Sequence, residues 1–191
     1  MPTESTPARR APRADVARNR ARILEAARML FAERGNAVQM HEVASAAGVG
    51  IGTVYRHFAA REALIEAAAE HRFADIEEFA QSVCLADTHG QGLARYLRHV
   101  GEVLERDRGL TSAIEAARGA AGSEPRGEAR ARLEEVIGRL IERGQAAGAL
   151  RPDCAVADVY MISGCLSSVI RTRSGDWRRL LDLVVDGLRP R

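Results

Sequence analysis

The sequence predicts an all-α protein, and three observations support this fold class. Apolar residues recur at helical spacing through nearly all of the chain after residue 14, as in Ile23, Ala27 and Phe31. No alternating run of β-branched residues is bounded by turn signals, so we expect no strand. A hydrophobic content of 46% with 28% charged residues is that of an ordinary globular protein.

The first three helices are expected over residues 16–34, 40–47 and 51–58. Asp15 is the expected N-cap of the first helix, and Gly35 ends it because glycine adopts the left-handed cap conformation at low cost. The turn before the third helix begins at Gly48, which can take a positive φ. Val54 and Phe58 lie four residues apart and are expected to face a small shared core.

Six further helices bring the expected total to nine. A long helix is expected from about Arg61 to Val83, with one apolar stripe facing inward. The members of that stripe are Ala69, Phe73, Ile76, Ala80 and Val83. Residues 119–127 are rich in Gly, Ser and Pro and form the clearest linker. Beyond it, one helix is expected to end near Gly148, and Asp153 is the expected N-cap of the next.

The charge balance favours a local attraction to nucleic acid over a global one. The formal net charge is only +2, and all 28 basic residues are arginine. Any affinity for nucleic acid must therefore come from a basic patch. Residues 1–14 are rich in proline and arginine and are expected to form a disordered basic arm. This arm either enters a minor groove or stays a solvated tail.

The cysteines give no sign of a metal site. Cys84, Cys154 and Cys165 are odd in number and include no CxxC pair. We expect reduced thiols packed as small hydrophobes in a bacterial cytoplasm, with a redox switch as the alternative. No signal peptide is expected, and residues 159–170 are too short and too serine-rich to span a bilayer. The protein is thus expected to lack a membrane partner and to be nucleoid-associated when it is bound to DNA.

Residues 39–58 carry the strongest functional signal. They indicate a short helix, a glycine-containing turn and a second short helix with a polar outer face, which is the arrangement of a helix-turn-helix motif. Arginine on such a face can pair with guanine or hold a phosphate. Ile51 either touches a thymine methyl group or packs beside Val54. The expected contacts to double-stranded DNA are His41, Ile51, Gly52, Thr53, Tyr55, Arg56, His57 and Arg61.

Residues 18–66 resemble the tetracycline-repressor (TetR) family of bacterial regulators. The resemblance rests on an AxxLFxxxG signature in the first helix, a VAxxAGV turn, a GTxYxxF third helix and a basic-x-x-L start to the fourth. The residues that carry it are Ala27, Leu30, Phe31, Gly35, Val43, Ala44, Ala47, Gly48, Val49, Gly52, Thr53, Tyr55, Phe58, Arg61 and Leu64. One departure is the pair Val38 and Gln39, where members usually place a capping Thr or Ser.

The resemblance implies a DNA-binding domain over residues 15–60 and a helical domain over 61–191 that dimerises and encloses a small-molecule pocket. Small residues in the eighth helix favour close helix approach across a dimer interface, with an intrachain core as the alternative. The expected interface residues are Ser163, Gly164, Ser167, Ser168, Leu181, Val184, Val185 and Leu188. The expected pocket residues are Phe73, Tyr96, Leu97, His99, Val100, Leu104, Ile137 and Ile141, for which a plain hydrophobic core is the alternative.

These features predict a sequence-specific transcriptional regulator. The expected form is a homodimeric repressor that binds a palindromic operator and is released by an unknown small-molecule effector. An activator of the same fold and a ligand-free architectural DNA-binding protein are the alternatives. No Ser/His/acid set, phosphate loop or metal-ligand cluster emerges from the sequence, so we expect no catalytic residue, no metal and no cofactor.

Overall fold

The computed structural model describes residues 12–120 and 122–190, which are helical and contain no strand. The helices of this part of the chain are α1 (Pro12–Arg34), α2 (Met40–Ala46), α3 (Ile51–His57), α4 (Arg61–Phe79), α5 (Gly92–Arg106), α6 (Arg108–Arg118), α7 (Gly127–Ala146), α8 (Val156–Thr172) and α9 (Trp177–Gly187). The all-α prediction and the expected total of nine helices are confirmed for these residues.

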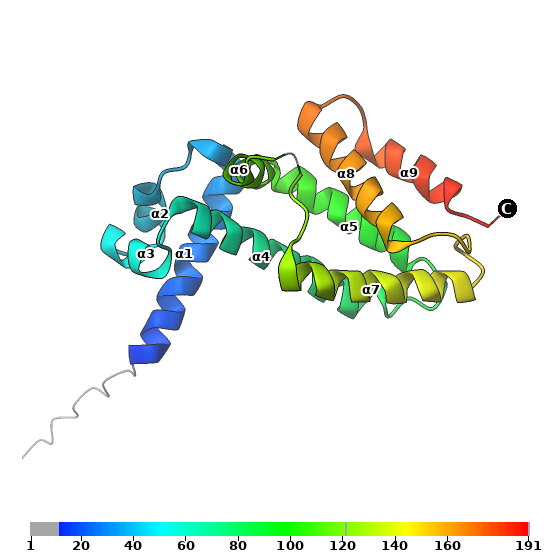
Figure 1. Cartoon of the computed structure of the whole chain (residues 1–191), viewed down its shortest axis with the longest axis horizontal. Helices are drawn as coiled ribbons and strands as arrows, with labels where there is room; N and C mark the ends of the chain where they lie inside the picture. Colours follow the sequence, from blue (N-terminus) through cyan, green and yellow to red (C-terminus); the bar gives the residue numbers. More distant parts are fainter. Residues whose placement is uncertain (1–11, 121, 191) are drawn as a thin grey trace, which may run out of the picture.

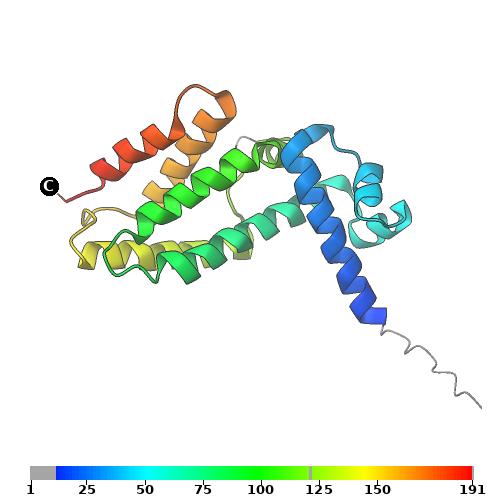
Figure 2. The same ribbon diagram turned by 180° about the vertical axis from the view of Figure 1, so that it is seen from behind.

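The helices gather into two groups that α4 connects. Helices α1, α2 and α3 lie at one end of the molecule, and α4 runs from them into a group that contains α5, α7, α8 and α9 (Figure 1). Seen from behind, the first turns of α1 extend away from the other helices (Figure 2). Helix α6 packs against both α1 and α4. The two groups therefore meet through α4 and α6.

The three-helix end has its own apolar centre. Val54 and Phe58, the inward pair predicted for α3, are buried, and so are Ile23, Phe31 and Val43. Gly48 takes the predicted positive φ of 61°, which lets the chain turn between α2 and α3. This packing sets the position of α3 on the surface of the molecule.

The start of α1 differs from the prediction. The helix begins at Pro12, so residues 12–14 are helical and Asp15 lies in the first turn instead of capping it. Asp15 pairs with Arg18 one turn later, and an acidic side chain in a first turn also favours the helix dipole. The rest of the expected disordered arm, residues 1–11, lies outside the described residues.

The C-terminal end of α4 changes register. A π-helical segment (Ala80–Cys84) follows α4 directly, so the predicted long helix continues but with one wider turn. The wider turn leaves Val83, predicted to face inward, 39% exposed and buries Cys84 instead. Burial raises the pKa of the Cys84 thiol to about 11. Cys84 and Cys154 are buried as expected, whereas Cys165 is exposed on α8.

The prediction that Asp153 caps the eighth helix is wrong. The N-cap of α8 is Ala155, and the Asp158 carboxylate accepts a hydrogen bond from the Ala155 N–H at 2.9 Å. Asp153 instead pairs with Arg151 in the preceding turn. The predicted linker after α6 is a loop that ends where α7 begins at Gly127. None of the helices within residues 12–120 and 122–190 is long and apolar enough to cross a membrane.

Candidate nucleic-acid interface and cavity

Helix α3 presents an open outer face. Tyr55 is 50% exposed and Ile51 is 42% exposed, while Val54 anchors the opposite side of the helix in the core. A Cβ atom added at Gly50 or at Gly52 would meet no atom within 4 Å. Backbone N–H groups at the start of α3 can therefore approach a phosphate without a side chain in the way. The exposure of Ile51 also favours the expected contact role over packing beside Val54.

Arg56 is folded back onto its own helix. Its Nε donates to the Gly52 carbonyl at 3.1 Å, and its Nη2 donates to the Thr53 Oγ1 at 3.0 Å. The side chain is exposed, so these short-range hydrogen bonds can be exchanged for contacts to DNA at small cost. Thr53 and His57 are half-buried beside it, and His41 is exposed at the start of α2.

Glu42 replaces the capping hydroxyl that the start of α2 lacks. Its carboxylate accepts a hydrogen bond from the Gln39 N–H at 2.8 Å and forms an ion pair with the Arg34 guanidinium at 2.7 Å. The Gln39 N–H, and after it the Arg34 guanidinium, hold the pKa of Glu42 below its ordinary value. Glu42 therefore holds the start of α2, where the exposed Gln39 stands in place of the usual Thr or Ser.

Arg61 makes structural contacts that were not expected from the sequence. Its Nε donates to the Val38 carbonyl at 3.0 Å, and its Nη2 donates to the Asn36 carbonyl at 2.9 Å. The guanidinium also lies 5.4 Å from the centre of the Phe31 ring. These contacts join the start of α4 to the turn before α2. Arg61 thus has a structural role, and its expected contact to DNA stays a prediction.

Two arginines of α1 lie beside the motif and were not predicted from the sequence. Arg22 donates to the carbonyl of Gly48 at 3.3 Å, and Arg20 lies 4.6 Å from the centre of the Phe58 ring. Both are exposed, and they bring positive charge to the edge of the turn and of α3. Their spacing gives no signal, because residues two apart on a helix point to different sides; only their charge, on the helix before the motif, was available in the sequence.

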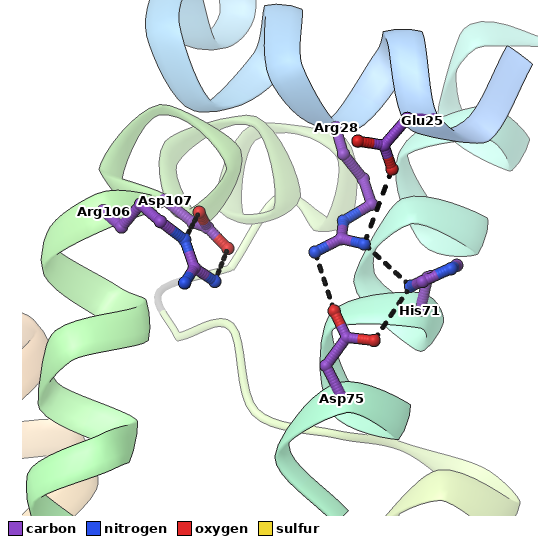
Figure 3. Close-up of polar contacts among 6 residues, drawn as sticks. All are labelled: Glu25, Arg28, His71, Asp75, Arg106 and Asp107. Atoms are coloured by element: carbon purple, nitrogen blue, oxygen red, sulfur yellow. Dashed lines mark hydrogen bonds and ion pairs between the residues drawn. The ribbon is translucent and has the colours of Figure 1, made fainter. Parts of the chain in front are cut away.

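A polar cluster joins α1 to α4. Arg28 donates to Asp75 at 2.7 Å, and its other terminal nitrogen lies 2.9 Å from Nδ1 of His71 (Figure 3). The contacts of Arg28 connect α1 to α4, so the two helices are expected to move together. Figure 3 also shows the Asp107 carboxylate turned towards Arg106, from whose Nε it accepts a hydrogen bond at 3.0 Å.

A cavity of about 270 Å³ lies between α4, α5, α7, α8 and the loop before α7. Of the expected pocket residues, five line it: Phe73, Tyr96, Val100, Leu104 and Ile137. Leu97 and Ile141 are buried in the surrounding core instead. His99 stacks on Phe79, with ring centres 3.8 Å apart, and is not part of the lining. Burial lowers the pKa of His99.

Comparison with known proteins agrees with this architecture. Residues 23–68 match the N-terminal model of the bacterial regulatory proteins of the tetR family, and residues 89–190 match the C-terminal domain of SbtR-like transcriptional regulators. The second match alone spans more than half of the chain. The chain belongs to the TetR family of transcriptional regulators. A search among curated proteins gives no match.

Several solved structures resemble the chain over nearly its whole length. A TetR regulator from Mycobacterium vanbaalenii is 36% identical with a TM-score of 0.68, and covers 94% of this chain and 99% of its own. The TetR regulator SCO0520 from Streptomyces coelicolor is 34% identical with a TM-score of 0.66, and the match covers 90% of this chain and 98% of SCO0520. RolR, crystallised with its ligand resorcinol, is 24% identical with a TM-score of 0.63 and shares the fold. The match covers 93% of this chain and 91% of RolR.

The small residues of α8 face the cavity of this TetR regulator. Ser163, Gly164, Ser167 and Ser168, expected at a dimer interface, all belong to the cavity lining. Leu181 is fully buried within the chain, so it has no surface left for a partner. The spacing of these four residues puts them on one face of α8, but the sequence did not show that this face meets the cavity.

The exposed apolar surface of the α8–α9 hairpin lies elsewhere. Met161 on α8 is 63% exposed, and Leu183 on α9 is 53% exposed. A groove between the two helices is lined by Met161, Ile162, Cys165, Leu180, Val184 and Leu188, among others. Val184, Val185 and Leu188 from the expected interface are only partly buried. Met161 and Leu183 were not among the expected interface residues.

Proposed function

We propose that this TetR regulator is a homodimeric repressor that binds a palindromic operator and leaves it when a small molecule occupies the cavity. The observation that carries the proposal is the course of α4. Its first residue, Arg61, holds the turn before α2, and its later residues Phe73 and Ile76 line the cavity. One helix thus touches both sites, which is the physical contact that coupling between them needs.

The DNA-reading role is proposed for residues 15–60, with α3 in the major groove. Thr53, Tyr55 and Arg56 are the side chains best placed to make contacts, because they lie on the outer face of a helix whose inner face is anchored. The proposed set also holds His41, Ile51, Gly52 and His57, with Arg20 and Arg22 as added phosphate contacts.

Dimerisation is proposed for residues 61–191, through the outer face of α8 and α9. The exposed Met161 and Leu183 support this choice, because large apolar side chains at the surface favour a protein partner. Two such hairpins would form a four-helix bundle. A twofold axis through it would place the two α3 helices about 34–36 Å apart, one turn of DNA, and so require a palindromic site.

Release is proposed to follow from linkage between the cavity and α3. A ligand that binds more tightly to a different arrangement of α4 and α6 moves the two α3 helices of the dimer away from the spacing that fits the operator. A coupling of about 1–3 kcal/mol lowers operator affinity by about 5- to 150-fold. The structural likeness to RolR, a relative of the same fold crystallised with resorcinol, supports a cavity that takes small molecules.

The first test is selection of bound sequences from a random DNA pool, followed by titration of the selected site. We expect a palindromic consensus, and we expect Tyr55→Ala and Arg56→Ala to weaken binding by about tenfold or more. Arg139→Ala is the matched control, since Arg139 is an exposed arginine on α7, far along the chain from α3. It is expected to bind the selected site as the wild type does.

The result also separates the alternatives. Binding without a consensus, set only by salt concentration, would replace this proposal with an architectural DNA-binding protein. Transcription in vitro from a promoter that carries the selected site distinguishes a repressor from an activator. We expect transcription to fall when the protein is added.

A further inference from the structure

A buried arginine with no carboxylate partner forms part of the cavity wall. Arg72 on α4 is 1% exposed and lines the cavity. Its Nη1 donates to Oγ1 of Thr111 at 3.0 Å, and its Nη2 donates to the carbonyl of Ser123 at 3.2 Å. Its Nε has no hydrogen-bond partner among the described residues. Among the described residues, the guanidinium therefore donates hydrogen bonds to neutral acceptors alone.

The charge on Arg72 has no directly paired counterion and is only partly balanced by its surroundings. No carboxylate of the described residues lies within 4.0 Å of it, and the nearby Asp107 is paired with Arg106. Burial lowers the pKa of Arg72 to about 10; Asp107 opposes this shift, and Arg118 and Arg28 add to it. Arg72 still carries its charge at neutral pH. A buried cation without a counterion is costly, so its retention at a cavity wall calls for a functional reason.

The two carboxylates of the cavity lining do not serve as that counterion. Glu115 accepts a hydrogen bond from the Gly122 N–H at 3.1 Å and lies 3.9 Å from the Arg171 guanidinium. Glu124 is exposed, and its carboxylate lies over its own loop, 2.4 Å from where a Cβ atom on Gly122 would be. Neither carboxylate pairs with Arg72 among the described residues, so the guanidinium remains available to a group that comes from outside.

A second polar group of the lining is also without a partner. The hydroxyl of Tyr160 on α8 is buried and makes no hydrogen bond to the described residues. Burial raises the pKa of this hydroxyl, so it remains a donor at neutral pH. The rest of the wall is mainly apolar, with Phe73, Ile76 and Val100 among its members. Unused donors in an apolar cavity favour a ligand with one acceptor group and an apolar body.

We propose that the effector is a small carboxylic acid with an apolar body, whose carboxylate accepts hydrogen bonds from the guanidinium of Arg72. The inference rests on the proposed effector role of the cavity and adds the chemical class of the ligand. A single buried cation favours a monoanion over a dianion such as a phosphate ester. Arg72 also donates hydrogen bonds to Thr111 on α6 and to the Ser123 carbonyl in the loop before α7. A carboxylate that binds the guanidinium competes with these two acceptors and so changes the contacts between α4, α6 and the loop.

The test compares acids with their own primary amides, which have the same apolar body but no charge. The probes are octanoate, 4-propylbenzoate and indole-3-acetate, each beside its amide, with affinity measured by calorimetry and by thermal shift. We expect at least one acid to bind the wild-type protein about tenfold or more tightly than its amide, because hydrogen bonds to a charged group in a buried site are the stronger ones. The same acid is expected to lower affinity for the selected operator.

The variants assign the preference to Arg72. Arg72→Met replaces the guanidinium with a shorter apolar chain, which removes the cost of the buried charge but leaves the Ser123 carbonyl and the Thr111 hydroxyl without their donor. We expect it to fold and to lose the preference for the acid. Arg72→Lys keeps the charge without the planar fork and should retain an intermediate preference. Arg139→Met, which removes an exposed guanidinium from α7, should retain the full preference.

The outcomes separate the ligand class from the effector role. If an amide binds the wild type as well as its acid, or if Arg72→Met keeps the preference, the ligand class is wrong while the effector role stands. If Arg72→Met is strongly destabilised and no acid is preferred, Arg72 is only a connection between α4, α6 and the loop. If no probe of either kind binds while operator binding is intact, the effector role of the cavity fails, and this inference fails with it.

Discussion

The backbone of Gly109, near the start of α6, lies directly against the carbonyl of Phe31, near the end of α1. A Cβ atom on Gly109 would lie 2.2 Å from the Phe31 oxygen and 2.6 Å from the Ala32 oxygen. Only glycine allows two backbones to approach this closely. The contact joins the three-helix end to α6, whose Thr111 holds the buried Arg72 beside the cavity. It is a second physical connection between the two proposed sites, in addition to α4.

The first prediction concerns this contact. Gly109→Ala forces α6 away from α1, and we expect it to lower the free energy of unfolding by about 1–3 kcal/mol, as overpacking does. We also expect weaker operator binding, because the three-helix end moves. The matched control is Gly138→Ala on α7, where a Cβ atom meets nothing within 4 Å. That change should stabilise the protein by about 0.5–1 kcal/mol, so equal effects of the two substitutions in denaturant titrations would contradict the prediction.

The second prediction separates structural from DNA-contacting arginines. Arg61→Met leaves the Val38 and Asn36 carbonyls without their donor, and we expect a loss of about 1–3 kcal/mol in the free energy of unfolding. Arg56→Ala removes an exposed side chain, so its stability should stay within about 0.5 kcal/mol of the wild type while operator affinity falls. An Arg61→Met protein of normal stability but poor operator affinity would show instead that Arg61 contacts DNA.

The third prediction tests the dimer surface. Leu183→Glu places a charge on the exposed outer face of α9, and burial of an unpaired charge at an interface is strongly unfavourable. We expect monomers in sedimentation experiments and a loss of tight operator binding. Val83→Glu, at another exposed apolar position on the π-helical segment, is the control and should remain dimeric. A dimer that survives Leu183→Glu would place the interface on another surface.

The fourth prediction concerns pH. Burial lowers the pKa of His99 below its ordinary value of about 6.5, so the folded state holds this proton less tightly than the unfolded state. The contribution of His99 to stability is therefore fully present above pH 6.5 and is lost as the pH falls through the lowered pKa. His99→Gln cannot titrate, and its unfolding free energy should fall less between pH 7 and pH 5 than that of the wild type. Identical pH profiles would show that the stacked ring does not titrate as expected.

The sequence by itself determined the fold class and the DNA-reading motif, because both depend on neighbours in the chain. The spacing of Val54 and Phe58 sets which side of α3 faces inward, and Gly48 sets the turn before it. The exposed positions of Tyr55 and Arg56 then follow from helical geometry alone. Five of the eight expected pocket residues line the cavity for the same reason, since they share the inner stripes of α4, α5 and α7.

The tertiary structure decided which partner each face meets. Helical periodicity placed Ser163 and Ser167 on one side of α8, but only the packing of α8 against the other helices turned that side towards the cavity. Arg61 has the sequence position of a DNA contact, yet carbonyls more than 20 residues earlier take up its donors. The absence of a carboxylate partner for Arg72 among the described residues likewise depends on α6 and a distant loop, which supply only neutral acceptors. Local sequence sets the direction of a side chain along its helix, whereas its charge balance and burial are set by residues that are near only in space.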